Sequence, residues 1–196
     1  LAVAAGMVVS SAMFTGVFET MYGTFVRLVY QKTYDAMLGT HLRIHEMFIG
    51  ELLFAASKGA VFSTVVLLVT TVLGGRPTAW CVFVPVVGFA TAYLFACLGL
   101  IITSYVKMIN NFSFFATGVI TPLFYFSGTF FPVRGRSAVL DVISTLVPLT
   151  APIELSRALF KAQFTGETLM HLGILLVYTA LLHVWALRRM TARVLR

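Results

Sequence analysis

The stretch AWCVFVPVVGFATAYLFACLGLIITSY, residues 79–105, decides the fold class because it carries no charged side chain. A helix needs about 20 mostly apolar residues to cross roughly 30 Å of hydrocarbon. The stretch exceeds that length, and its proline, Pro85, is tolerated inside a span when neighbouring groups satisfy the freed carbonyl. We therefore predict a membrane-spanning helix over Ala79–Tyr105.

Four other segments are similarly long and apolar, and we predict an all-α, polytopic transmembrane helical bundle. These segments are Leu1 to about Phe18, about Phe48 to Leu73, Asn110 to about Val133, and Leu169–Leu187. The connection at residues 134–168 contains two amphipathic stretches, Ser137–Leu146 and Ile153–Phe164. Amphipathic segments of this kind lie in the membrane interface, so we expect short helices on the membrane surface there.

The composition excludes an ordinary soluble domain. Hydrophobic residues make up 59% of the 196 residues and charged residues 11%, whereas soluble domains are about 25% charged. The net charge of +7 does not indicate nucleic-acid binding, because the basic residues lie in short clusters between apolar runs. Cys81 and Cys97 lie in one apolar run, which favours buried thiols over a disulfide or zinc site.

The distribution of Lys and Arg predicts the orientation. Eight of the 14 basic residues fall on the side that holds Arg27 and the C-terminal tail RRMTARVLR, and five fall on the other. The richer side is expected to be cytoplasmic, which places Leu1 outside. We therefore expect one further span before Leu1, with five spans visible of six in a single transmembrane domain covering residues 1–196.

The segment 27–46 is too polar for insertion, and Tyr34, Met37 and Leu38 have helical spacing. A short amphipathic helix on the cytoplasmic side suits docking into a groove of a soluble partner. An interfacial helix resting on lipid is the alternative interpretation.

Three motifs resemble a known family. FETMYGTFVRLVYQKTYDAMLGTHL (residues 18–42), GELLFAASKGA (50–60) and FYFSGTFFPV (124–133) are similar to the type-2 ABC exporter permeases, in particular the nodulation protein NodJ group, over essentially the whole chain. His41 departs from the family pattern, in which a proline is expected, and this departure bears on how the coupling element ends.

The resemblance implies a permease homodimer with two NodI-like ATPase subunits in the bacterial inner membrane. It also implies export of a lipo-oligosaccharide or lipid-linked glycan. The coupling region that contacts the ATPase would comprise Thr33, Tyr34, Asp35, Ala36, Met37, Leu38, Gly39 and Thr40.

Charged side chains inside the bilayer are costly and usually face protein or a wet cavity. Glu51 and Lys58 lie seven residues apart on one helix face, and we expect them to line the substrate route or to lock helices together. Glu19 is a candidate partner of Lys58. The alternative is that Glu51 sits at the interface while Lys58 extends toward it.

Aromatic residues crowd the outer end of the fourth predicted span, and they predict an outer gate. The alternative is an interfacial aromatic belt. The residues are Phe124, Tyr125, Phe126, Phe130 and Phe131.

No catalytic constellation or phosphate-binding GxxxxGK[ST] loop occurs in the sequence. We therefore expect no catalytic residue and no cofactor in this chain, with ATP and Mg bound by the partner ATPase. His41, His45 and Glu46 lack a third ligand in a zinc-binding order, so we predict no metal site. The competing functions are a drug exporter of the same class, a secondary transporter or channel without an ATPase, and a membrane-embedded enzyme.

Overall fold

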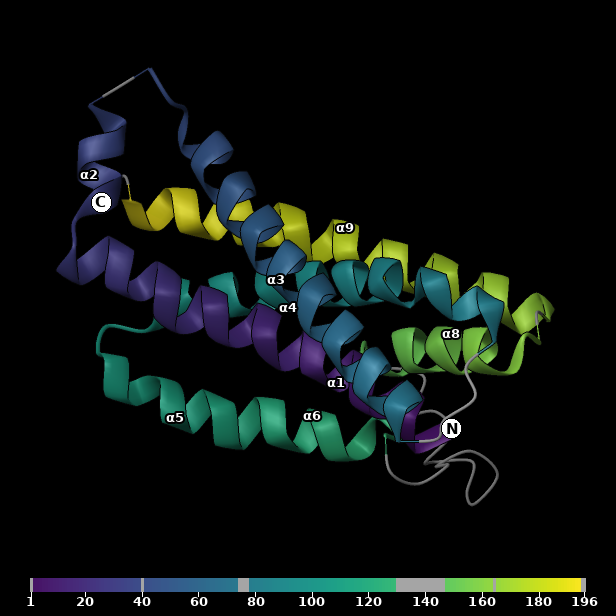
Figure 1. Ribbon diagram of the computed structural model, residues 1–196. Helices are drawn as coiled ribbons and strands as arrows, with labels where there is room; N and C mark the ends of the chain where they lie inside the picture. Colours follow the sequence, from purple (N-terminus) through teal and green to yellow (C-terminus); the bar gives the residue numbers. More distant parts are fainter. Residues whose placement is uncertain (1, 40, 74–77, 130–146, 164, 195–196) are drawn as a thin grey trace.

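The protein is a bundle of helices, shown as a computed structural model in Figure 1. The structure describes residues 2–39, 41–73, 78–129, 147–163 and 165–194, and no strand occurs among them. The helical elements are α1 (Ala2–Phe18), η1 (Glu19–Gly23), η2 (Val26–Tyr30), α2 (Thr33–Leu38), α3 (Ile44–Val72), η3 (Ala79–Phe83), α4 (Val84–Tyr105), η4 (Ile109–Asn111), α5 (Phe112–Phe115), η5 (Ala116–Ile120), α6 (Thr121–Phe126), α8 (Thr150–Lys161) and α9 (Gly166–Val194).

Among the described residues, four helices are long and apolar enough to cross a membrane. They are Val3–Tyr30, Ile44–Val72, Ala79–Tyr105 and Gly166–Val194. The all-α transmembrane bundle is therefore confirmed. The predicted fourth span forms a helical stretch from η4 through α6, which is not one of these four, and its predicted continuation at residues 130–133 lies outside the described residues.

The first helix is longer than predicted. The charge of Glu19 predicts an end near Phe18, but helical structure continues through η1 and η2 to Tyr30. The charge is tolerated because Glu19 pairs with Arg27 and Lys58, and a paired carboxylate costs far less to bury than an isolated one.

The centre of the bundle is a close packing of α1, α3 and α4. Ala92 on α4 lies against Gly16 of α1 and Gly59 of α3, where an added Cβ would overlap Ala92 atoms. Small residues let helix backbones approach closely in a membrane, where van der Waals contact replaces the hydrophobic drive. The small residues at these positions thus allow the three helices to approach this closely.

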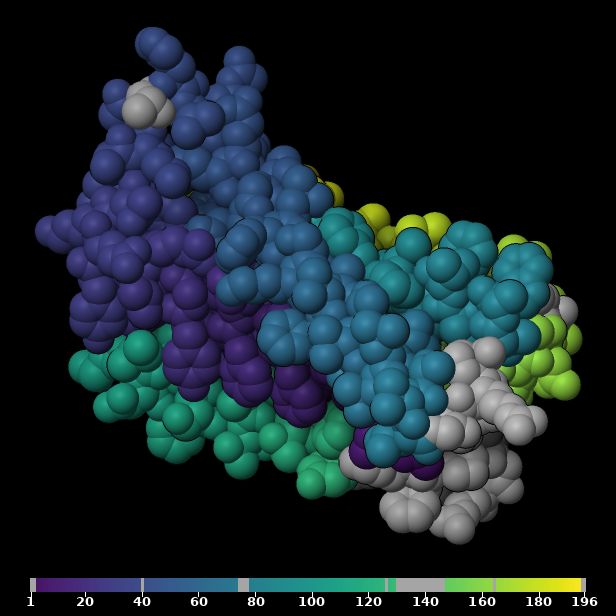
Figure 2. Space-filling model, viewed as in Figure 1, coloured from purple at the N-terminus to yellow at the C-terminus, as the bar shows by residue number. Residues whose placement is uncertain are grey.

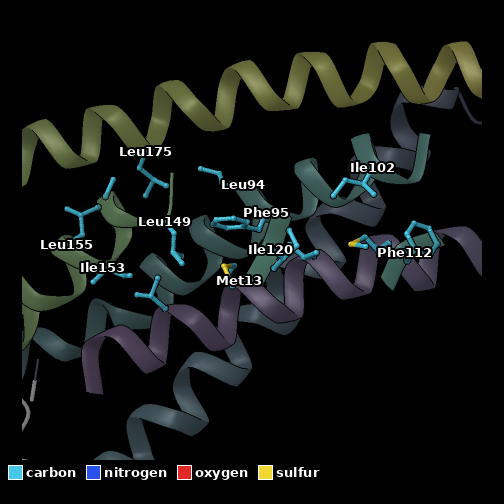
Figure 3. Close-up of a cluster of buried hydrophobic side chains, with 14 of the residues drawn as sticks. Met13, Leu94, Phe95, Ile102, Phe112, Ile120, Leu149, Ile153, Leu155 and Leu175 are labelled. Carbon is cyan, nitrogen blue, oxygen red and sulfur yellow. The ribbon is translucent and has the colours of Figure 1, made fainter. Parts of the chain in front are cut away.

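The main hydrophobic cluster joins segments that are distant in the sequence. Figure 3 shows Met13 of α1 beside Phe95 of α4 and Ile120 of η5, with Leu149 and Leu175 completing the cluster toward α8 and α9. Phe112 at the start of α5 packs edge-on against Phe25, with ring centroids 5.2 Å apart. These contacts hold the α5–α6 stretch alongside α1 (Figure 1).

Helix α8 packs its apolar face on protein. It is amphipathic, as its sequence indicates, and Ile153 and Leu155 join the main cluster while Leu159 and Phe160 join a second cluster with Cys81. The apolar face therefore meets α1, α4 and α9, and the expected position on the membrane surface stays a prediction. The first amphipathic stretch, at residues 137–146, lies outside the described residues.

The two ends of the bundle are distinct. In Figure 1, α2 and the C-terminus lie at one end, and α8 lies near the N-terminus at the other. The segments predicted to lie on one side of the membrane are thus grouped at one end of the molecule. We call it the α2 end.

Candidate coupling helix and intramembrane charge network

Helix α2 presents most of its side chains to the outside. Asp35, Ala36, Met37, Leu38 and Gly39 are exposed, Thr33 is half-buried, and Thr40 lies outside the described residues. Tyr34 is the exception, with an exposed fraction of 1%. The predicted stripe of Tyr34, Met37 and Leu38 is therefore split between two environments, because Tyr34 turns into the bundle.

Tyr34 anchors α2 to α3. Its hydroxyl donates a hydrogen bond to Oε1 of Glu51 at 2.7 Å, and its ring packs against Phe48 with centroids 5.5 Å apart. Burial raises the pKa of Tyr34 above its ordinary value, and the Glu51 carboxylate raises the pKa further. The hydroxyl is thus held in its protonated, donating form.

Glu51 is almost buried, with an exposed fraction of 9%, and three groups satisfy its carboxylate. Oε1 accepts the Tyr34 hydroxyl, and Oε2 accepts a hydrogen bond from the Thr24 hydroxyl at 3.2 Å. Oε2 also lies 2.9 Å from Nη2 of Arg27. A buried carboxylate that is paired and hydrogen-bonded in this way costs far less free energy than an isolated one.

Arg27 extends the network toward Lys58. Its Nη2 lies 3.3 Å from Oε1 of Glu19, whose Oε2 lies 2.8 Å from Nζ of Lys58. A Cβ on Gly23 would lie 3.0 Å from Nη2 of Arg27 and 3.1 Å from Oε1 of Glu19. Glycine at position 23 therefore leaves room for the pair.

The result is a continuous chain of contacts from Tyr34 through Glu51, Arg27 and Glu19 to Lys58. We call it the charge network. Two carboxylates and two cations give it no net formal charge, which makes such a group affordable at membrane depth. Glu51 and Lys58, which the sequence placed on one helix face, are joined through residues of the first helix rather than to each other.

Two π-helical turns carry residues of the charge network. Glu19 begins η1 and Arg27 lies in η2, while Thr24 lies between the two turns. A π turn widens the helix and is frequent at functional sites, because it re-aims side chains that a regular helix would direct elsewhere. The pattern sets the carboxylate and the guanidinium on the face toward α3.

A groove opens beside Lys58 and Glu19. Its volume is about 500 Å³, and it is lined by Phe14, Thr15, Phe18, Glu19, Tyr22, Gly23, Lys58 and Phe62. In Figure 2, α1 is visible between α3 and the α5–α6 stretch, so this side of α1 is not covered by either. The groove combines aromatic faces with one ion pair, which suits an amphipathic molecule.

The predicted outer-gate aromatics lie only partly within the described residues. Phe124 packs in the main cluster, with its ring centroid 5.2 Å from that of Phe14, and Tyr125 is exposed. The side chain of Phe126 and both Phe130 and Phe131 lie outside what the structure describes. The predicted gate therefore remains a prediction.

The segment that contains His45 and Glu46 forms the first turn of α3. The Glu46 side chain accepts a hydrogen bond from the backbone N–H of Arg43 at 3.0 Å, closing a capping box at the first turn of α3. His45 lies 3.5 Å from the Thr191 hydroxyl of α9. Within the described ranges, no three His, Cys, Asp or Glu side chains are grouped as a metal site would need.

Arg27 and Thr24 were not among the predicted site residues. Because the predicted first span ends near Phe18, Thr24 falls outside it and Arg27 falls at the start of the predicted cytoplasmic segment 27–46. The available signal was the spacing of Glu19, Gly23 and Arg27 at intervals of four, which puts them on one helix face if the helix continues.

Comparison with known proteins identifies the family. A family model described as ABC-2 type transporter matches residues 2–161. Nodulation protein J of Rhizobium leguminosarum bv. viciae is 35% identical over 89% of this chain and 68% of its own length. The Sinorhizobium fredii and Bradyrhizobium diazoefficiens nodulation protein J are 33% and 31% identical, each over 91% of this chain and 68% of the relative.

No solved structure matches the chain significantly. The family match covers well over half of the residues. The apolar helices of the structure, which are long enough to cross a membrane, agree with a transporter family. The resemblance drawn from the three sequence motifs is thereby confirmed, and the chain belongs to the ABC-2 type transporter family, as a permease with nodulation protein J among its relatives.

Proposed function

We propose that the chain is the permease subunit of an ATP-driven exporter of the bacterial inner membrane. A separate, NodI-like ATPase binds ATP and Mg and docks on α2, and two permeases form the homodimer that encloses the path. The cargo is a lipo-oligosaccharide or lipid-linked glycan. The assignment of cargo rests on the likeness to nodulation protein J.

The observation that carries the proposal is that α2 is exposed on one side and tied into the membrane on the other. Met37 and Leu38 offer apolar surface to a partner, and an amphipathic helix seated in a partner's groove is a common docking mode. Tyr34 fastens the same helix to Glu51. A push on α2 would therefore reach α3 through this hydrogen bond and the first helix through the ion pair of Glu51 with Arg27, rather than through a flexible linker.

The charge network supplies the route from α2 to the groove. Moving Tyr34 away would remove a donor from Glu51, and Arg27 would be drawn more strongly to Glu51 and less to Glu19. Glu19 would then pair with Lys58 only, at the edge of the groove. The network thus converts displacement of α2 into a change of polarity where an amphipathic cargo would lie.

The first experiment separates an ATP-driven permease from a channel or secondary transporter. The Met37→Glu/Leu38→Glu variant places charge on the exposed side of α2. The amount of ATPase that co-purifies with the permease in mild detergent should therefore fall at least tenfold relative to the wild type. Loss of one interface anchor typically costs about 2 kcal/mol. Met108→Glu is the matched control, because Met108 is also apolar and exposed but lies outside α2.

Three readouts are measured on the same membranes: the amount of permease, ATP hydrolysis in the purified complex, and transport of labelled glycolipid into vesicles of inverted orientation. Normal transport by the α2 variant without any bound ATPase would rule out the proposal. ATP-dependent transport of a hydrophobic drug but of no glycolipid would keep the exporter and replace its cargo.

A further inference from the structure

A second cavity lies at the α2 end, between the end of α4 and the last turns of α9. Its volume is about 300 Å³, and it is lined by Ser104, Tyr105, Val106, Lys107, Arg189, Ala192 and Arg193. The charge network does not include any of these residues. Of the described residues that line the cavity, three are cationic and none is acidic.

The cations of this cavity are held in different ways. Arg193 donates to the carbonyl oxygen of Thr103 and lies over the ring of Phe25, so its position is fixed by the bundle. Arg189 lies 5.1 Å above the ring of Tyr105. Neither Lys107 nor Arg189 is ion-paired with any described residue, which leaves both charges available to an anion.

The face of α9 next to the cavity is graded from apolar to basic. Leu181, Trp185 and Arg189 are exposed and follow one another at intervals of four residues, so they lie one above another on one side of the helix. Trp and Tyr rings are enriched at the level of the lipid headgroups. Trp185 and Tyr105 therefore mark the height at which Arg189 meets the membrane surface.

We propose that this cavity binds the headgroup of an anionic phospholipid. The phosphate lies between Lys107 and Arg189 with Arg193 behind it, and an acyl chain follows α9 past Trp185 and Leu181. Basic pockets between transmembrane helices are a recurrent form of lipid recognition. The graded face of α9 selects a molecule with both an anionic head and a hydrocarbon tail over a free anion.

The bound lipid would support the packing at the end of the bundle where α2 is anchored. Arg193 connects the cavity to Thr103 and Phe25, and the Thr103 hydroxyl donates to the carbonyl of Thr20 in η1 at 3.0 Å. The site is thus attached to the same π-helical region that carries the charge network. The binding itself does not depend on the proposed cargo or ATPase.

The test uses the fluorescence of Trp185 in reconstituted bilayers. The chain has two tryptophans, and Trp80→Phe leaves Trp185 as the single reporter. The full chain is placed in phosphatidylcholine bilayers that contain increasing fractions of brominated phosphatidylglycerol or, separately, brominated phosphatidylcholine. Bromine quenches tryptophan on contact, so quenching measures which lipid lies beside Trp185.

The brominated phosphatidylglycerol should quench at a severalfold lower fraction than the brominated phosphatidylcholine. Lys107→Gln and Arg189→Gln should each weaken this preference about fivefold, and together they should abolish it. Arg188→Gln is the matched control, because Arg188 is an exposed neighbour on α9 that does not line the cavity. Arg189→Lys keeps the charge and should keep most of the preference.

Three outcomes would overturn the assignment. The first is equal quenching by both lipids in the parent protein. The second is an equal loss of the preference for phosphatidylglycerol in Arg188→Gln and Arg189→Gln. The third is loss of this preference on addition of millimolar inorganic phosphate. The last result would mean that the cavity takes a free anion rather than a lipid. Arg189→Lys preserves the charge. If this variant retains the preference for phosphatidylglycerol while Arg189→Gln loses it, misfolding is excluded as the cause of the loss.

Discussion

The hydroxyl of Tyr34 on α2 donates a 2.7 Å hydrogen bond to the carboxylate of Glu51 on α3. This contact links α2 to a charged residue of the bundle, and Glu51 in turn pairs with Arg27. A helix with an exposed apolar edge is thereby attached to charged groups inside the membrane.

The Tyr34→Phe variant removes the donor and leaves the ring in place. Because Thr24 and Arg27 still satisfy Glu51, the cost should be about 1–2 kcal/mol, as for one hydrogen bond to a charged group. Amide exchange of residues 33–38 should become faster, and ATP hydrolysis should become less dependent on transport. Tyr30→Phe is the control, because Tyr30 is an exposed tyrosine at the end of the preceding helical turn, η2; equal effects in both variants would contradict the anchoring role.

Alkaline pH should weaken the same contact. The pKa of Tyr34 is raised in the folded chain above its ordinary value of 10.0, chiefly by burial. The stabilisation from this protonated hydroxyl is therefore complete below pH 10 and is lost as the pH rises above it, at up to about 1.4 kcal/mol per pH unit. Unfolding in detergent should show a larger loss of stability between pH 9 and pH 11 for the wild type than for Tyr34→Phe, and parallel curves would refute the assignment.

Glu19 and Lys58 should behave as an energetically coupled pair. Glu19→Gln removes a carboxylate that serves both Arg27 and Lys58, so it should destabilise the protein more than Lys58→Met does. The double variant should recover about 1 kcal/mol relative to the sum of the single effects, because the unpaired cation is removed as well. Thermal unfolding of the four proteins gives this value, and additive effects would show that the 2.8 Å contact contributes nothing.

Close helix packing should make Gly59 intolerant of even one methyl group. An added Cβ at Gly59 would overlap Ala92 of α4, whereas one at Gly50, on the same helix, would meet no atom within 4 Å. Gly59→Ala should lower stability by about 1–3 kcal/mol, as expected for overpacking, and Gly50→Ala should be neutral or slightly stabilising through its helix propensity. Expression and melting temperature in detergent measure both, and equal behaviour would mean that α3 and α4 are farther apart than described.

The two ends of the bundle should lie on opposite sides of the membrane. With Cys81 and Cys97 replaced by alanine, Asp35→Cys and Arg188→Cys should react with an impermeant maleimide only after the inner membrane is opened. Lys161→Cys, at the α8 end, should react in cells with a permeable outer membrane alone. Labelling of Asp35→Cys and Arg188→Cys from opposite sides would refute the orientation predicted from the basic residues.

The sequence by itself determined that this chain is a membrane protein with mainly helical spans. Uncharged runs such as residues 79–105 have no stable state in water and satisfy their backbone in lipid only as helices. The three motifs also indicated the family correctly. These properties are local, because they depend on the composition and order of neighbouring residues.

Only the tertiary structure decided where the first span ends and which charges belong together. Glu19 looked like the end of a helix because a lone carboxylate is costly in lipid, and that cost disappears only when Arg27 and Lys58 reach it from the same and from a neighbouring helix. Tyr34 likewise looked like part of a docking face until Glu51 gave its hydroxyl a buried partner. Pairing between helices is set by their relative positions in space, and residue order along one chain does not contain those positions.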